Sequence, residues 1–260
     1  MKKLGLTLVM AMMAVMLVAG GAWALPSTLY DILGYEGTQV YTDTGAEAVV
    51  LTDNDGVEDD ATAYLFLEAA GFRETNTFGI YGYTCDNVGN VVLGDMLEVF
   101  NGPASPGLPM TTGTIAFDVN AGTAWLSNTT VVKNIGPNFG FYLTTQQEII
   151  GGSWGDGDLN ADDGIDTLTY YSHTVFNQDN YDHAMIFNTM DDTVSGLCGS
   201  DVVVAFEDLW GGGDQDFTDM VVGVSDVAPA PVPEPGTMAL LGIGLLGLAF
   251  VGRKKLKIEE

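Results

Sequence analysis

The sequence predicts an all-β protein, an antiparallel β-sandwich that is jelly-roll-like and is flanked by a signal peptide and a transmembrane helix. Short runs rich in β-branched and aromatic residues fill the middle of the 260-residue chain. Clusters of Gly, Asn, Asp and Pro separate these runs, as turns require. Many short strands with Gly-rich turns favour an antiparallel sandwich. Each end of the chain carries an uncharged apolar run beside basic residues, which predicts the two flanking segments.

The first 24 residues have the pattern of a signal peptide. Lys2 and Lys3 precede an apolar run from Leu4 to Gly20, and Ala22-Trp23-Ala24 supplies an A-x-A cleavage site between Ala22 and Ala24. We therefore expect the Sec translocon to export the chain and signal peptidase to cut it after Ala24.

Residues 25–227 form the predicted acidic sandwich domain. A helix is considered only around Tyr64–Ala70, and no repeat of fixed period is visible. Strands are expected at Ala46–Thr52, Thr75–Tyr83, Asp95–Phe100, Gly113–Val119, Phe139–Thr145, Asp166–Ser172, His183–Asn188, Asp201–Leu209 and Asp219–Ser225.

The charge of this part of the chain is strongly negative. Between residues 25 and 235 lie 33 of the 35 acidic residues but only two of the eight basic ones, Arg73 and Lys133, so the formal charge there is −31. Such self-repulsion opposes compaction, and bound divalent cations or a saline medium would offset it. A nucleic-acid partner is excluded because phosphate binding needs basic patches. The many aromatic and β-branched residues argue against a disordered acidic chain.

The sharpest acidic motif is FEDLWGGGDQDFTDMVVGV, Phe206 to Val224. Two acids end a predicted strand, the turn Gly211–Gly213 follows, and three more acids precede the next strand. Ca²⁺ takes six to eight oxygen ligands, which carboxylates on a tight loop supply well. The sequence therefore predicts a calcium site, with a solvated acidic hairpin turn as the alternative. Its candidate ligands are Glu207, Asp208, Asp214, Asp216 and Asp219.

Two further acidic clusters are weaker candidates. In the first, Asp53, Asp55 and Asp59 are possible calcium ligands, and the D-x-D-G start is similar to the calcium loops of thrombospondin type 3 repeats. Its spacing departs from that of an EF-hand. The second, Trp154–Thr167, has Ala161 where an EF-hand needs Gly, so a solvated loop is favoured.

The remaining reactive residues do not predict catalysis. Cys85 and Cys198 form either one disulfide or two buried free thiols, and both possibilities stay open. His173 and His183 belong to no H-E-x-x-H motif, and no G-x-S-x-G motif is present. We therefore expect a protein that is not an enzyme.

The C-terminus combines three segments. Residues 228–235 are a Pro-rich linker that ends in Pro233, Glu234 and Pro235. Residues 236–252 are an uncharged run that would make a helix about 25 Å long, near the lower limit for crossing a bilayer. The tail, 253–260, holds the basic cluster that stops transfer and stays cytoplasmic, with Arg253, Lys254 and Lys255 at its start.

This order of triplet, apolar run and basic stop resembles the C-terminal sorting signal of PEP-CTERM proteins, which Gram-negative bacteria export and hand to an exosortase. The resemblance implies an inner-membrane-anchored precursor, transient contact with that membrane, and a final place at the cell surface or outside the cell. The segment Phe206–Val224 resembles the signature of the domain of unknown function 4114, F-E-D…G-G-x-D-x-D-[FY]-x-D, and has all its acidic positions. This second resemblance spans about Ala46 to Val224.

Together these features predict a non-catalytic, calcium-stabilised surface or extracellular matrix protein that an exosortase processes. Because PEP-CTERM systems are associated with exopolysaccharide production, the resemblance implies a role in biofilm or exopolysaccharide-associated structure. The alternative is a calcium-dependent adhesin that binds a defined carbohydrate.

Overall fold

The computed structural model describes residues 29, 33, 41–52, 59–68, 76–101, 111–148, 165–190 and 197–231. The chain divides into two units, residues 1–230 and 231–260, and the fold below belongs to the first. The predicted signal peptide, the Pro-Glu-Pro triplet, the transmembrane helix and the basic tail lie outside the described residues. Within the ranges given above, no helix is long and apolar enough to cross a membrane.

The described residues form twelve strands and two short 3-10 helices, η1 (Thr174–Phe176) and η3 (Trp210–Gly212). The strands are β1 (Val49–Leu51), β2 (Asp59–Leu67), β3 (Thr77–Cys85), β4 (Val91–Phe100), β5 (Thr112–Asp118), β6 (Thr123–Leu126), β7 (Asn138–Glu148), β8 (Ile165–Tyr171), β9 (Ala184–Asn188), β10 (Val202–Phe206), β11 (Met220–Val224) and β12 (Val227–Pro229).

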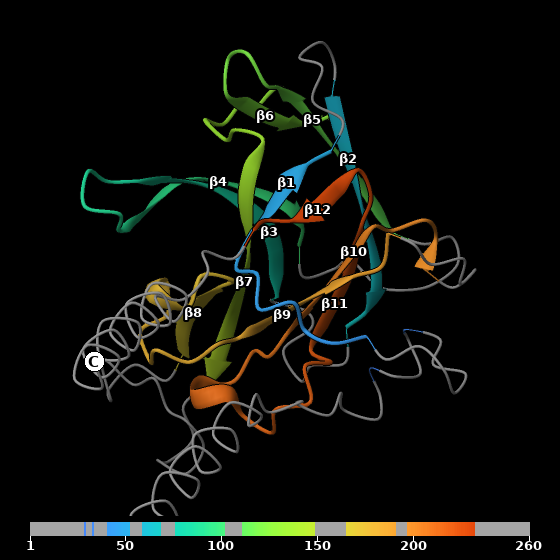
Figure 1. Ribbon diagram of the computed structural model, residues 1–260. Coiled ribbons are helices and arrows are strands. Elements are labelled where there is room, and N and C mark those ends of the chain that lie inside the picture. Colours follow the sequence, from blue (N-terminus) through green and yellow to red (C-terminus); the bar gives the residue numbers. More distant parts are fainter. Residues whose placement is uncertain are drawn as a thin grey trace, which may run out of the picture. The chain divides into compact units, whose positions relative to one another are not determined.

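Two antiparallel sheets share these strands (Figure 1). The first sheet has the order β12-β1-β7-β3-β4, with β8 beside β7, and the second has the order β6-β5-β2-β11-β10-β9. Two pairings, β1 with β12 and β2 with β11, join the beginning of the domain to its end in the manner of a jelly roll. Other strands pair with their sequence neighbours, β3 with β4, β5 with β6 and β7 with β8, so the fold is jelly-roll-like only in part.

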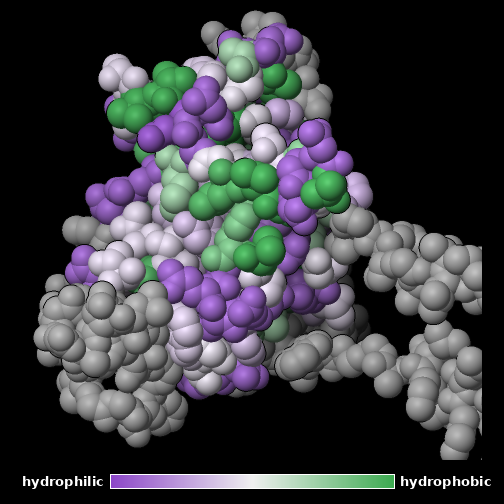
Figure 2. All heavy atoms as spheres, turned by 90° about the vertical axis from the view of Figure 1, so that its left-hand side faces the viewer, coloured by the Kyte–Doolittle hydropathy of each residue, from purple (hydrophilic) through white to green (hydrophobic). Residues whose placement is uncertain are grey.

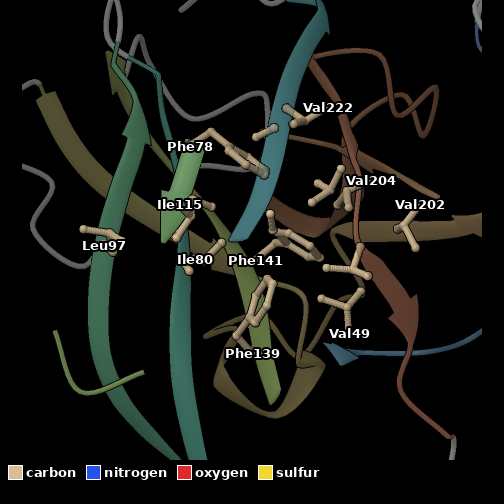
Figure 3. Close-up of a cluster of buried hydrophobic side chains, with 14 of the residues drawn as sticks. Val49, Phe78, Ile80, Leu97, Ile115, Phe139, Phe141, Val202, Val204 and Val222 are labelled. Carbon is tan, nitrogen blue, oxygen red and sulfur yellow. The ribbon is translucent and has the colours of Figure 1, made fainter. Parts of the chain in front are cut away.

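The sheets pack face to face over one hydrophobic core. Side chains from both sheets meet there (Figure 3). The ring centroids of Phe78 and Phe206, from opposite sheets, lie 6.1 Å apart, and those of Phe117 and Phe139 lie 5.3 Å apart. Such aromatic pairs add to the free energy gained by burying apolar area. This contact makes the two sheets a sandwich.

The second sheet is buried on its outer face as well. In β10 the residues Val203 and Ala205 point away from the core, because successive side chains of a strand face opposite sides, yet both are fully buried. Leu29 and Leu33 lie over them, in a turn in which the Leu33 amide donates to the Leu29 carbonyl at 3.0 Å. We call this layer the outer cluster; its members are Leu29, Leu33, Phe187, Leu197, Val203, Ala205, Phe217 and Val221.

By contrast, the β3–β4 hairpin projects from the sandwich (Figure 1). Val88, Val92 and Leu93 near its tip are exposed. Figure 2 shows apolar side chains among polar ones on the face from which this hairpin projects. The hairpin tip is therefore outside the core.

The structure confirms the nine predicted strands, each of which overlaps an observed one, and adds β2, β6 and β12. The helix considered at Tyr64–Ala70 is wrong for residues 64–67, which belong to β2 and pair with β11. The predicted domain end at residue 227 also needs correction, because Ala228 and Pro229 pair with β1. Pro229 is tolerated there because β12 is an edge strand.

The two cysteines lie in different surroundings from those predicted. Cys85 ends β3 on the projecting hairpin, and Cys198 precedes β10 in the second sheet. Both are exposed, and no disulfide joins them. Neither a disulfide between them nor a pair of buried thiols is observed.

We expect Leu29→Ala to lower the free energy of unfolding by about 2–5 kcal/mol, since it removes a fully buried side chain from the outer cluster. The measurement is urea unfolding of the protein. Leu93→Ala, at an exposed position on the hairpin, is the matched control and should change stability by about 0.5 kcal/mol or less. Equal effects of the two substitutions would contradict the docking of Leu29.

Candidate metal centre

Pairing of β10 with β11 brings distant acids together at one end of the second sheet. Phe206, the last residue of β10, pairs with Met220, the first residue of β11. Glu207 and Asp208 follow β10 directly, and Asp219 directly precedes β11. The antiparallel register therefore places these three carboxylates side by side.

The Gly-rich turn returns the chain over these acids. Gly211, Gly212 and Gly213 have φ values of 68°, 80° and 42°, which lie in the left-handed region that favours glycine. A Cβ atom on Gly213 would meet the Oε1 atom of Glu207 and the side chain of Leu209. Only glycine allows the turn to approach the carboxylates this closely.

The loop that follows the glycines is strained. Gln215 and Phe217 have φ values of 60° and 51°, although neither is glycine. Such conformations cost on the order of 1–3 kcal/mol each and persist where the surroundings hold them. Phe217 is held by burial in the outer cluster. Asp216 accepts hydrogen bonds at Oδ1 from the amide and the hydroxyl of Thr218, at 3.0 and 2.6 Å.

All five acids of the sequence motif take part in two groups that could hold a metal ion. We call them the inner triad (Glu207, Asp208 and Asp219) and the outer triad (Glu207, Asp214 and Asp216). Within each triad, one carboxylate oxygen from every member lies within 4.8 Å of the others. The inner triad is mostly buried, whereas Asp214 is exposed and Asp216 half-buried. We call the two triads together the metal centre.

The buried carboxylate of Glu207 lacks partners that would compensate its burial. The side chain is 0 % exposed, and its Oε2 atom has no hydrogen-bond partner. Its Oε1 atom has a long contact, 3.4 Å, with the Leu209 amide. Among the described residues Lys133 is the sole Lys or Arg, and it interacts with Asp95 instead. Burial of an unpaired carboxylate is costly, so this group needs a proton or a cation.

The raised pKa values of these acids show that burial and neighbouring carboxylates disfavour their charged forms. Burial, followed by repulsion from Asp219, raises the pKa of Glu207 to about 9, and burial and the same neighbour raise that of Asp208 to about 7. Burial also raises the pKa of Asp219. Protons therefore occupy the ion-free centre near neutral pH, and a divalent cation would displace them.

Asn76 is a member of this site that the sequence did not reveal. It lies just before β3 in the first sheet and is buried. Its Nδ2 atom donates to Oδ2 of Asp208 at 3.1 Å, while its Oδ1 atom has no partner. The amide of Asp208 donates to Oδ2 of Asp219 at 2.8 Å. The inner triad is thus connected to both sheets.

Both ring nitrogens of His183 form hydrogen bonds next to the loop. Its Nδ1 atom lies 2.9 Å from the Glu207 carbonyl oxygen, and its Nε2 atom lies 2.8 Å from Oδ2 of Asp179. Because a carbonyl oxygen only accepts, Nδ1 carries the hydrogen. The same Asp179 oxygen accepts a hydrogen bond from the Gly211 amide at 2.8 Å. His183 therefore positions the turn and is not available as a metal ligand in this arrangement.

The other predicted ligands are not part of this centre. Asp59 lies on β2, where it pairs with Phe117, and belongs to neither triad. Asp53, Asp55 and nearly all of the cluster at 154–167 lie outside the described residues.

Two family models match parts of this chain. Residues 134–226 match the domain of unknown function DUF4114, and residues 231–255 match the PEP-CTERM protein-sorting motif. The PEP-CTERM motif implies an exported protein that has a membrane-anchored precursor and is processed by an exosortase. Neither a curated protein nor a solved structure matches the chain.

The DUF4114 match covers β7 to β11 and all five carboxylates of the metal centre. It begins at residue 134, so β1 to β6 lie outside it, although the resemblance suggested a start near residue 46. Asn76 also lies outside the match.

In chelator, we expect the protein to lose stability as the pH rises from about 4 to about 9. A carboxyl whose pKa is raised on folding stabilises the native state below its ordinary pKa, near 4, and this contribution is lost as the pH rises through the raised value. Glu207→Gln mimics the protonated acid, so its stability relative to wild type should rise with pH. The measurement is the free energy of urea unfolding in EDTA. Parallel pH profiles of the two proteins would contradict the expectation.

Proposed function

We propose that this protein is an exported, non-catalytic surface protein whose sandwich is stabilised by calcium at the metal centre. The observation that carries the proposal is the fully buried Glu207, whose Oε2 atom has no partner and whose neighbours Asp208 and Asp219 are also carboxylates. Oxygen-only ligands favour Ca²⁺, Mg²⁺ or Mn²⁺ over zinc. Adaptable carboxylates on a loop suit the larger coordination number of Ca²⁺.

The position of the centre explains how calcium would stabilise the fold. An ion in the inner triad neutralises charge where β10 ends and β11 begins. Through Asp208 it also holds Asn76, which leads into β3 of the other sheet. At a free calcium concentration 100-fold above the dissociation constant, such binding contributes about 2.7 kcal/mol.

The grouping of a serine with a histidine supports a non-catalytic role. Ser172 Oγ donates to the Glu47 carbonyl at 2.7 Å and accepts from the Phe141 amide at 3.0 Å. The neighbouring His173 is bonded through Nδ1 to the hydroxyl of Tyr81. A nucleophile needs a base within reach, and here the serine hydroxyl is bonded to two backbone groups and to the Tyr81 hydroxyl instead.

We further propose that the processed protein acts in a biofilm or in exopolysaccharide-associated surface structure. The formal charge of −31 between residues 25 and 235 supports a medium rich in cations, since divalent ions offset repulsion within and between such molecules. A carbohydrate-binding adhesin with the same calcium centre is the competing proposal. Calcium-dependent binding of one sugar on a glycan array would favour the adhesin, and calcium-driven self-association without sugar binding would favour the structural role.

For the full-length protein in detergent, calcium should raise the melting temperature by about 5–10 °C over chelator when it is about 100-fold above the dissociation constant. Asp219→Asn should abolish most of this rise because it removes a carboxylate of the inner triad. Asp60→Asn, at an exposed position on β2, is the matched control and should keep the rise. A melting temperature that ignores calcium in the wild type would refute the proposal.

A further inference from the structure

We propose that the metal centre holds two divalent cations that share the carboxylate of Glu207. This inference rests on the proposed function, since it concerns the number and arrangement of ions at the same site. It divides the five acids of the motif into an inner site, buried beneath the loop, and an outer site on the loop itself.

The geometry separates the five carboxylates into two sets. Oxygen atoms bound to one Ca²⁺ at about 2.3–2.6 Å lie no more than about 5 Å apart. In each triad the offered oxygen atoms lie within 4.8 Å of one another, which satisfies this limit, and Glu207 is the common member. The five acids do not form one group within this distance: Asp208 and Asp219 appear in one triad, and Asp214 and Asp216 in the other.

Glu207 has the properties of a bridging ligand. A bridging carboxylate directs one oxygen to each ion. Oε2 of Glu207 is buried without a partner, and Oε1 lies beside Gly213, on the side of the loop that leads to Asp214. The contact of Oε1 with the Leu209 amide, at 3.4 Å, is too long to satisfy that oxygen. Both oxygens are therefore available to cations.

Other hydrogen bonds fix the remaining ligands in orientation. Asn76 and the Asp208 amide hold one oxygen of Asp208 and of Asp219, respectively. Thr218 holds Oδ1 of Asp216. These hydrogen bonds hold carboxylates of both triads in position before an ion binds.

Charge and burial predict different affinities for the two sites. The five carboxylates carry a formal charge of −5, of which one Ca²⁺ leaves −3 and two leave −1. In the inner site Glu207 and Asp208 are buried and Asp219 is half-buried, while Asp214 of the outer site is exposed to water. We therefore expect a tight inner ion and a weaker, exchangeable outer ion.

The test counts calcium bound to the full-length protein in detergent, by equilibrium dialysis, and compares variants with wild type so that ions bound elsewhere cancel. Asp214→Asn with Asp216→Asn should lose one ion yet keep most of the calcium-dependent rise in melting temperature. Asp208→Asn with Asp219→Asn should abolish that rise. Asp60→Asn should match wild type in both measurements.

The outcomes separate the two proposals. If the outer double variant loses no ion, or loses one ion together with the whole rise in melting temperature, a single ion is bound and the inference is overturned, while the calcium-stabilised surface protein stands. If neither double variant changes the number of bound ions or the melting temperature in calcium, both proposals fail. Because the outer substitutions lie at exposed or half-buried positions, that variant is expected to fold.

Discussion

The constraint on which this structure depends is the burial of negative charge where β10 passes into the loop that returns to β11. Three carboxylates, from Glu207, Asp208 and Asp219, meet there, and the sole Lys or Arg among the described residues, Lys133, interacts with Asp95 instead. An uncompensated buried charge costs several kcal/mol, comparable with the net stability of a whole domain. The site must therefore bind protons or cations, and the raised pKa values of its acids express that need.

The surrounding fold makes the site rigid from three directions. Pairing of Phe206 with Met220 places the next residue, Glu207, and the preceding residue, Asp219, at the same end of the sheet. Asn76, just before β3, donates a hydrogen bond to Asp208, and this bond links the first sheet to the metal centre. Phe217, in the loop, is buried with Leu29 and Leu33 in the outer cluster. An ion that orders the loop also orders Phe217, and so couples the centre to the layer that covers the second sheet. Through Phe217, the loop that carries Asp214, Asp216 and Asp219 is packed against Leu29 and Leu33.

The sequence was sufficient for features that are local. The nine predicted strands and the acidic loop follow from residue type and short-range spacing, which the structure preserves. The sequence-based prediction was wrong where strand pairing outweighs local preference. Residues 64–67 form an apolar run for which a helix was considered, but pairing of β2 with β5 and β11 makes them part of a strand. Strand β12 was not predicted because Pro229 argues against a strand. The strand forms because β12 lies at the edge of its sheet, where proline is tolerated. Asn76 carried no local signal, since its role depends on Asp208, 132 residues away.

The location implied by the sorting motif and the chemistry of the centre fit each other. Extracellular calcium modules work with dissociation constants of about 10⁻⁴–10⁻³ M, far weaker than cytosolic buffers. A loop strained at Gln215 and Phe217, and crowded with like charges, is well suited to that range, because part of the binding energy is spent in holding the loop. With the proposed ions as stabilisers, the loop region would gain its full stability only after export. A chain that is exported before an exosortase processes its C-terminus benefits from such a delay, since the stabilising ligand is met after export.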